Sequence, residues 1–187
     1  MSGPAPAWLV AIDMQEIFGR PDSPWFTPEY DRASTGIQRL LPAFDGDVIF
    51  TRFVAPAEPR GAWIPYYEQW PFARVPPEDP LYELTEPFRG AAPRVQTRDT
   101  FGKWDAEFAR AMAGSTEMVL TGVSTDCCVI STALAAADAG VHVRVAADAC
   151  AGLSPADHRR ALDAMGLYAP LIEITTVDEV LANGAHP

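Results

Sequence analysis

The chain has 187 residues, of which 48% are hydrophobic and 21% are charged, and its net charge is −11. This size and composition predict one globular domain with a sizeable core, which we place over residues 1–187. The acidic balance argues against nucleic acid and membrane surfaces as partners, since both are usually bound through a basic face.

The beginning of the chain and its cysteines bear on the compartment. Residues 1–15, MSGPAPAWLVAIDMQ, lack the basic segment and the long apolar core of a secretory signal peptide. No apolar run approaches the roughly 18 residues that a membrane span needs. The odd set of cysteines, Cys127, Cys128 and Cys150, argues against a disulfide framework. We therefore expect a cytoplasmic protein with reduced thiols.

Short apolar runs alternate with longer helical patterns along the chain. The runs are typical of strands and lie at 8–12, 47–53, 94–97, 117–122, 141–148 and 171–176. Helices are predicted near 29–41, 104–113, 126–139 and 155–168. Strands without polar alternation are buried on both faces, so this order predicts a parallel sheet covered by helices, a three-layer α/β fold.

The segment 54–93 interrupts this alternation, because it is dense in proline and aromatic residues. A loop of this length is uncommon in a compact domain unless it has a function. Two interpretations fit its composition. The aromatic side chains either cover the end of the domain or a subunit contact, or they form the wall of a pocket.

Polar residues follow two of the predicted strands. Asp13 ends the run at 8–12, and the run at 117–122 continues into GVSTDCCVIST at 122–132. Ligands of open α/β sheets bind at the carboxyl ends of the strands. If these strands are neighbours, Asp13 faces the first turn of the following helix, where the helix dipole and free N–H groups favour a thiolate. Asp13 could then accept the proton of a thiol.

The two adjacent cysteines cannot be told apart by spacing. Neighbouring residues on a helix point about 100° apart, so we expect only one of Cys127 and Cys128 to face such a site. Either could be that residue as far as this argument goes.

Three motifs of the chain resemble the isochorismatase-like cysteine hydrolases, a family that includes nicotinamidases and N-carbamoylsarcosine amidohydrolases. The motifs are LVAIDMQEIF at 9–18, RDTFGKW at 98–104 and GVSTDCCVISTALAAADAG at 122–140. With VRVAADACAG at 143–152, the similarity runs from about residue 8 to residue 177. The resemblance implies a Rossmann-like, six-stranded parallel sheet of order 3-2-1-4-5-6, in which the first and fourth strands are neighbours.

The resemblance also implies roles for single residues. The cysteine directly before valine in the third motif is Cys128, which is implied to be the nucleophile, while Cys127 packs elsewhere. Asp13 is implied to be the acid that takes the thiol proton. A cis peptide bond between Val123 and Ser124 is implied as well, and it would let the N–H groups of Ser124 and Cys128 form an oxyanion hole.

The position of the family's catalytic lysine is occupied by another residue. When the second motif is aligned on its Phe-Gly and Trp residues, that position holds Arg98. Arginine keeps the positive charge, but it does not deprotonate in proteins. Lys103 lies five residues later and could reach Asp13 instead if the intervening turn is rearranged. The sequence does not decide whether Arg98 or Lys103 takes the role of the family's lysine.

The family's metal ligands are also missing. Nicotinamidases of this family carry an Asp-x-His pattern after the second strand, whereas this chain reads TRFVAP at 51–56. We therefore expect no catalytic metal, and we expect no cofactor.

Other residues have weaker claims to the site. Four aromatic residues are candidate walls of a substrate pocket, with core packing as the alternative; they are Phe18, Phe53, Trp63 and Trp104. Gln15 is a candidate hydrogen-bond partner near the acid, while Thr125 and Thr132 are expected to form local turn and helix bonds. We expect no catalytic role for His142 or His158.

Together these observations predict a cysteine-dependent amidohydrolase that cleaves an amide or ureido C–N bond of a small molecule through a thioester. A homo-oligomer is expected. Two alternatives remain: a hydrolase of vinyl ethers, which needs no thiol, and a catalytically degraded module that binds small molecules. A redox role has the least support, because the two cysteines lack the CxxC spacing.

Overall fold

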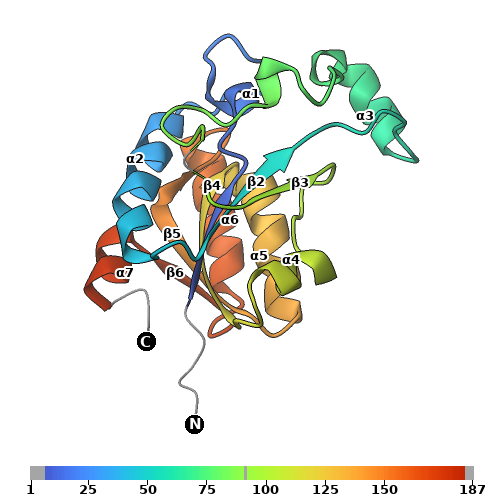
Figure 1. Cartoon of the computed structure of the whole chain (residues 1–187). Helices are drawn as coiled ribbons and strands as arrows, with labels where there is room; N and C mark the ends of the chain where they lie inside the picture. Colours follow the sequence, from blue (N-terminus) through green and yellow to red (C-terminus); the bar gives the residue numbers. More distant parts are fainter. Residues whose placement is uncertain (1–6, 91, 184–187) are drawn as a thin grey trace.

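The computed structural model describes residues 7–90 and 92–183, and its centre is a sheet of six parallel strands (Figure 1). The order is β3-β2-β1-β4-β5-β6, with β1 (Trp8–Ile12), β2 (Val48–Phe53), β3 (Val95–Arg98), β4 (Glu117–Val123), β5 (His142–Ala151) and β6 (Ile172–Thr175). The strand β1 pairs with both β2 and β4. The order therefore reverses between β1 and β4, where ligands of open α/β sheets bind. The predicted three-layer fold and strand order are confirmed.

Helices cover both faces of the sheet (Figure 1). One face is covered by α2 (Tyr30–Leu40) and α7 (Val177–Asn183), and the other by α4 (Ala106–Ala111), α5 (Ile130–Asp138) and α6 (Pro155–Gly166). Residues of β1 alternate between the two cores, with Leu9 and Ala11 in the first and Val10 and Ile12 in the second. Because both faces of the strand are buried, its apolar run is continuous.

The observed elements differ from the predicted ones mainly at their ends. Three helices were not predicted: α1 (Glu16–Gly19), α3 (Trp63–Gln69) and α7. The helix predicted at 126–139 begins with a separate π-helical turn, η4 (Thr125–Val129), before α5. The strand β5 extends to Ala151 because a register shift between Leu120 and Gly122 lets it pair with the end of β4. No helix of residues 7–90 and 92–183 is long and apolar enough to cross a membrane.

The segment 54–93 is more ordered than the predicted loop. It contains α3 and two short 3₁₀ helices, η2 (Pro71–Ala73) and η3 (Pro80–Tyr82), and Figure 1 shows α3 lying beyond the end of β2. Another 3₁₀ helix, η1 (Leu41–Ala43), follows α2. In α3, Trp63 packs against Tyr66 and Tyr67, three and four residues later, the spacing of one helical face. Pro65 is tolerated because it lies in the first helical turn.

Candidate active site

Asp13 follows β1 directly, at the reversal of strand order. Its side chain is completely buried, and its φ of +49° lies in the left-handed region that few residues other than glycine adopt. Thr51 on β2 holds it twice. The Thr51 hydroxyl accepts from the Asp13 N–H at 3.0 Å and donates to Asp13 Oδ1 at 2.6 Å. This leaves Asp13 Oδ2 for other contacts.

Lys103 supplies the positive charge beside Asp13. Its Nζ lies 2.9 Å from Asp13 Oδ2, and neither side chain has any exposed surface. The ammonium also donates to the Thr100 carbonyl at 2.7 Å. The backbone N–H of Lys103 donates to Thr132 Oγ1 at 3.0 Å, and this hydroxyl in turn donates to the Cys128 carbonyl at 2.7 Å. Thr132 therefore ties the lysine to the helical segment that carries the thiol.

The structure thus decides between the two cations that the sequence left open. Arg98 does not reach Asp13; its Nε lies 2.8 Å from Asp105 Oδ2, and its Nη2 lies 3.3 Å from Glu107 Oε2. Arg98 ends β3, which is separated from β1 by β2. Aligning the second motif on its Phe-Gly and Trp residues assigned the family's lysine position to Arg98. In the folded chain Arg98 is the last residue of β3, and Lys103, after the following turn, is the cation buried beside Asp13.

Cys128 lies in η4, directly after β4. The Ser124 carbonyl accepts hydrogen bonds from the N–H groups of Cys127 and Val129, both at 3.1 Å, on either side of Cys128. This widened turn is the start of the helix that the sequence predicted. Single π-helical turns occur frequently at functional sites.

The surroundings of Cys128 favour the neutral thiol over the thiolate. Burial and the neighbouring Asp13 carboxylate raise its pKa well above the ordinary value, and Lys103 opposes them only in part. The stabilisation of a thiolate by the helix N-terminus, expected from the sequence, is therefore outweighed. Asp13 Oδ2 accepts no well-directed hydrogen bond within residues 7–90 and 92–183, although the Lys103 ammonium lies 2.9 Å away.

The residues between β4 and η4 bring Ser124 to the same place. The Val123–Ser124 peptide bond is cis, as the resemblance implied, and Ser124 lines a cavity together with Cys128. Gly122 has a φ of +102°, and a Cβ there would overlap the carbonyl oxygen of Ile12. Glycine is therefore required where β4 passes the end of β1.

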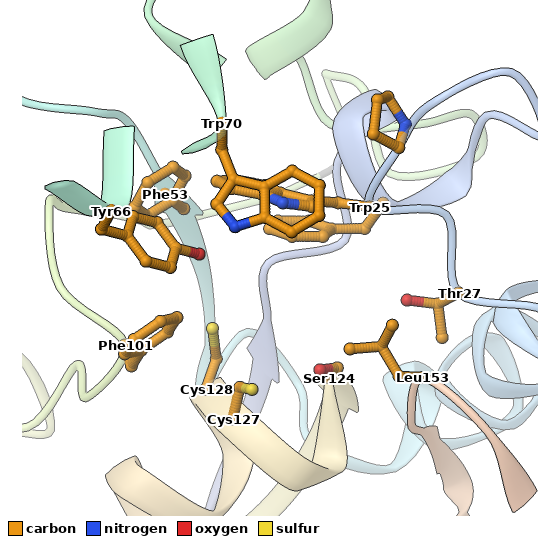
Figure 2. Close-up of a pocket in the computed structure, with 12 residues that line it drawn as sticks. Trp25, Thr27, Phe53, Tyr66, Trp70, Phe101, Ser124, Cys127, Cys128 and Leu153 are labelled. Carbon is orange, nitrogen blue, oxygen red and sulfur yellow. The ribbon is translucent and has the colours of Figure 1, made fainter. Parts of the chain in front are cut away.

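A cavity of about 150 Å³ opens above Cys128 (Figure 2). Its floor contains Ser124, Cys127 and Cys128, and its aromatic walls are Phe18, Trp25, Phe53, Tyr66, Trp70 and Phe101. Pro24, Thr27 and Leu153 complete the lining. None of the described lining residues is Lys, Arg, Asp, Glu or His. An apolar cavity of about this size holds one aromatic ring.

The wall is built around Trp25. Its ring stacks on Phe18 at a centroid distance of 6.0 Å and meets Phe53 edge to face at 5.7 Å. Tyr66 and Trp70 come from α3 and its end, with centroids 6.0 and 6.1 Å from Trp25. Part of the segment 54–93 therefore lines the cavity, which is the second of the two interpretations of its composition.

Two of the four predicted wall residues do line the cavity, and two do not. Phe18 and Phe53 contribute to the lining, whereas Trp63 packs behind it against Phe101, with centroids 5.1 Å apart. Trp104 packs against the core cluster that contains Phe108, and the centroids of the two rings are 5.7 Å apart. Their place in the folded chain, rather than their residue type, removes them from the cavity.

The expectation that Cys127 packs elsewhere is wrong. Its side chain is half-buried and lines the cavity beside Cys128 (Figure 2). The angular separation of neighbouring helical residues did not exclude this, because the cavity borders Ser124 as well as both cysteines. The third thiol, Cys150, is fully buried in the same core cluster as Cys128 but does not line the cavity.

Sequence reasoning missed Trp25 and Phe101 as wall residues, and it offered Tyr66 and Trp70 only as members of the aromatic segment 54–93. Phe101 lies within the second motif, and Tyr66 and Trp70 lie in the aromatic segment, so residue type gave a signal for these three. Trp25 stands in the irregular connection between α1 and α2, and no pattern around it pointed to a pocket.

The remaining polar candidates have structural partners. The Gln15 amide donates to the carbonyls of Phe53 and Tyr82 at 2.9 and 2.8 Å, so it joins β2 to η3 rather than contacting the acid. Thr125 Oγ1 lies 2.8 Å from His158 Nδ1. His142 contacts Glu117 at 2.8 Å where β4 and β5 begin, the edge opposite Asp13.

Comparisons with known proteins agree with this architecture. The sequence matches the isochorismatase domain over residues 7–179. No curated protein matches the chain. Among solved structures, a cysteine hydrolase from Pseudomonas syringae has a TM-score of 0.78 and 20% sequence identity, with 97% of each chain covered.

Two further structures carry more specific names. An N-carbamoylsarcosine amidase from Thermoplasma acidophilum has a TM-score of 0.72 and 20% identity, covering 94% of this chain and 98% of its own. A nicotinamidase from Bacillus subtilis has a TM-score of 0.70 and 18% identity, covering 90% and 98%. At these identities the structural likeness shows the shared fold.

Proposed function

The chain belongs to the isochorismatase domain family, and from that premise we propose that it is a cysteine hydrolase that cleaves a C–N bond of a small amide or ureido compound. One observation carries this proposal. Asp13, Lys103 and Cys128 lie close together and are buried, and Cys128 alone of the three lines the cavity. A nucleophile, a base and a cation are the groups that acyl transfer needs.

In the first step, Asp13 Oδ2 takes the proton of the Cys128 thiol as the sulfur attacks the substrate carbonyl. The raised pKa of the thiol means that this transfer occurs on attack rather than in the free protein. Lys103, at 2.9 Å, balances the charge of the carboxylate before the transfer. The N–H groups of Ser124 and Cys128 stabilise the oxyanion that forms.

The intermediate then collapses. The carbon–nitrogen bond breaks, Asp13 gives its proton to the departing nitrogen, and ammonia or an amine leaves behind a thioester on Cys128. A water molecule, deprotonated by Asp13, attacks the thioester carbonyl. The carbon–sulfur bond breaks, the thiol recovers its proton from Asp13, and the acid product leaves.

The cavity supports an uncharged aromatic or apolar acyl group as the part of the substrate that it binds. Its lining has no charged residue among those described, and about 150 Å³ suits a single ring. Lys103, Arg98 and Arg20 have acidic partners in Asp13, Asp105 and Asp22, and no basic side chain is among the described residues that line the cavity. An anionic substrate would therefore lose its hydration without gaining a counter-charge.

The alternatives lose support for separate reasons. The degraded binding module rested on the replacement of the family's lysine, and Lys103 places an ammonium beside Asp13. Vinyl-ether hydrolysis needs no thiol, whereas Cys128 lies at the cavity floor. Both alternatives stay as outcomes of the test below.

The test measures ammonia released from uncharged aryl carboxamides, starting with benzamide, together with the intact mass of the protein during turnover. We expect an acyl adduct on Cys128 and loss of turnover in Cys128→Ala. Cys150→Ala is the matched control, because that thiol lies outside the cavity. Turnover that survives Cys128→Ala would favour the thiol-independent hydrolase. An inert Cys128 in a folded chain that still binds the amide would favour the binding module.

A further inference from the structure

The cavity floor presents two thiols rather than one. Cys127 and Cys128 are adjacent in the chain, neither is in a disulfide, and both line the same cavity. Figure 2 shows the two side chains side by side at the start of the helix, with that of Cys128 directed towards the aromatic walls and that of Cys127 towards the side of Ser124. The hydrolytic mechanism uses only Cys128, so the second thiol has no assigned role.

The number of sulfur ligands limits what such a pair can hold. Within residues 7–90 and 92–183, no group of three or more His, Cys, Asp or Glu side chains is arranged to hold a metal ion. Structural metal sites of the zinc type use four protein ligands. Trivalent arsenic that already carries one carbon substituent has two valences left. Two thiols therefore match it in number.

We propose that Cys127 and Cys128 form a binding site for trivalent organoarsenic compounds that carry one aryl group. The arsenic atom bridges the two sulfurs at the cavity floor, and the aryl ring occupies the cavity above. The ring contacts there are those of Trp25, Phe53 and Tyr66. This site goes beyond the proposed hydrolysis, because capture needs neither Asp13 nor Lys103.

The reaction balances without any other reactant. In the hydrated form of the arsenical, two As–OH bonds break and two As–S bonds form, and each thiol proton leaves with a hydroxide as water. Neither arsenic nor sulfur changes its oxidation state. Burial raises the pKa of both thiols, so both carry the proton that the reaction removes.

The adjacent positions also favour an arsenic bridge over a disulfide. The two Cα atoms are held about 3.8 Å apart by the intervening peptide bond. A disulfide between neighbours closes a small, strained ring, whereas the bridging arsenic atom enlarges that ring. No oxidant is needed, which suits a chain whose thiols are all free.

The experiment uses the full chain with one equivalent of phenylarsine oxide in the presence of excess 2-mercaptoethanol. Intact mass spectrometry should show one adduct, equal to phenylarsenic less two hydrogens. It should persist in 2-mercaptoethanol and be removed by 2,3-dimercaptopropanol. Trypsin separates the pair from the third cysteine, since it cuts after Arg110, Arg144 and Arg159. The adduct should lie on peptide 111–144 and not on peptide 145–159.

Variants test whether both sulfurs take part. Cys127→Ser and Cys128→Ser should each bind the arsenical about 100-fold more weakly, since a tethered second contact raises affinity on that scale. Cys150→Ala should bind it as the wild type does. An adduct on peptide 145–159, one that 2-mercaptoethanol removes, or one that Cys127→Ser retains unchanged would overturn the proposal. The peptide map of the wild type shows whether the arsenical binds at Cys127 and Cys128 even if a variant fails to fold. None of these readouts requires hydrolytic activity.

Discussion

Lys103 Nζ lies 2.9 Å from Asp13 Oδ2, and neither side chain has any surface exposed to solvent. Each charge has lost its hydration and depends on the other for compensation. The pair joins the chain after β3 to the end of β1, so it also holds Asp13 and Lys103 in one position relative to each other. Its removal should therefore affect both stability and chemistry.

Lys103→Ala should lower the free energy of unfolding by about 3–5 kcal/mol, because it leaves Asp13 buried without a counter-charge. Arg98→Ala is the matched control. Its partner Asp105 is exposed to solvent, and pairs with an exposed member contribute about 0–1 kcal/mol. Urea unfolding of the two variants measures the difference. Equal decreases in the free energy of unfolding would show that the buried pair contributes no more to stability than the pair of Arg98 does.

Asp13→Asn should reduce kcat/KM by about 10²–10⁴-fold, because an amide cannot take the proton of the Cys128 thiol. The matched control is Asp126→Asn, which changes a carboxylate that accepts the Leu153 N–H at 3.1 Å and lies outside the ion pair. That variant should keep most of the activity. Steady-state kinetics with the best uncharged amide compares them, and a similar loss in both would contradict the role of Asp13.

The stability of the chain should fall as pH rises above the ordinary thiol pKa of about 8.5. Burial raises the pKa of Cys128 and Cys127, and that of Cys150 to about 12, so the folded chain keeps thiol protons that the unfolded chain releases. The unfolded state then binds fewer protons, and the free energy of unfolding decreases with pH.

Urea unfolding at a series of pH values between 7 and about 9 tests this, below the range where tyrosines titrate in the unfolded chain. Cys150→Ala should show a shallower decline, because one of the three contributions is removed. A flat profile, or an unchanged slope in this variant, would speak against buried neutral thiols.

Trp25→Ala should raise KM for an aryl amide by roughly tenfold, since a large aromatic wall of the cavity is lost. Trp104→Ala serves as the control, because Trp104 packs against Phe108 and does not line the cavity. Its effect should appear in the unfolding free energy rather than in KM. A comparable rise in KM for both variants would mean that the cavity is not the binding site.

The cavity should also discriminate by charge. An aryl amide with an added carboxylate should react at least about 100-fold more slowly than its uncharged counterpart, because a buried charge without a partner costs several kcal/mol. The ratio of the two kcat/KM values measures this. Preference for the anionic compound would indicate that a basic side chain reaches the substrate.

Local patterns in the sequence predicted much of this fold. Continuous apolar runs identified the inner strands such as β1 and β4, because these are buried on both faces, whereas the edge strands β3 and β6 are shorter and partly exposed. The helices α1, α3 and α7 were not predicted, since they have four to seven residues and little room for a hydrophobic period. The Pro-rich composition of 54–93 also hid α3, where the proline occupies the first turn.

The sequence by itself determined the layered α/β fold and pointed to Asp13 and Cys128, since each follows an apolar strand that runs into the same edge of the sheet. Only the tertiary structure decided that Lys103 rather than Arg98 contacts Asp13, because the turn between them sets which cation enters the core. It also decided that Cys127 faces the cavity and which aromatic residues line it. Those contacts join segments far apart in the chain, and no local pattern specifies where such segments meet.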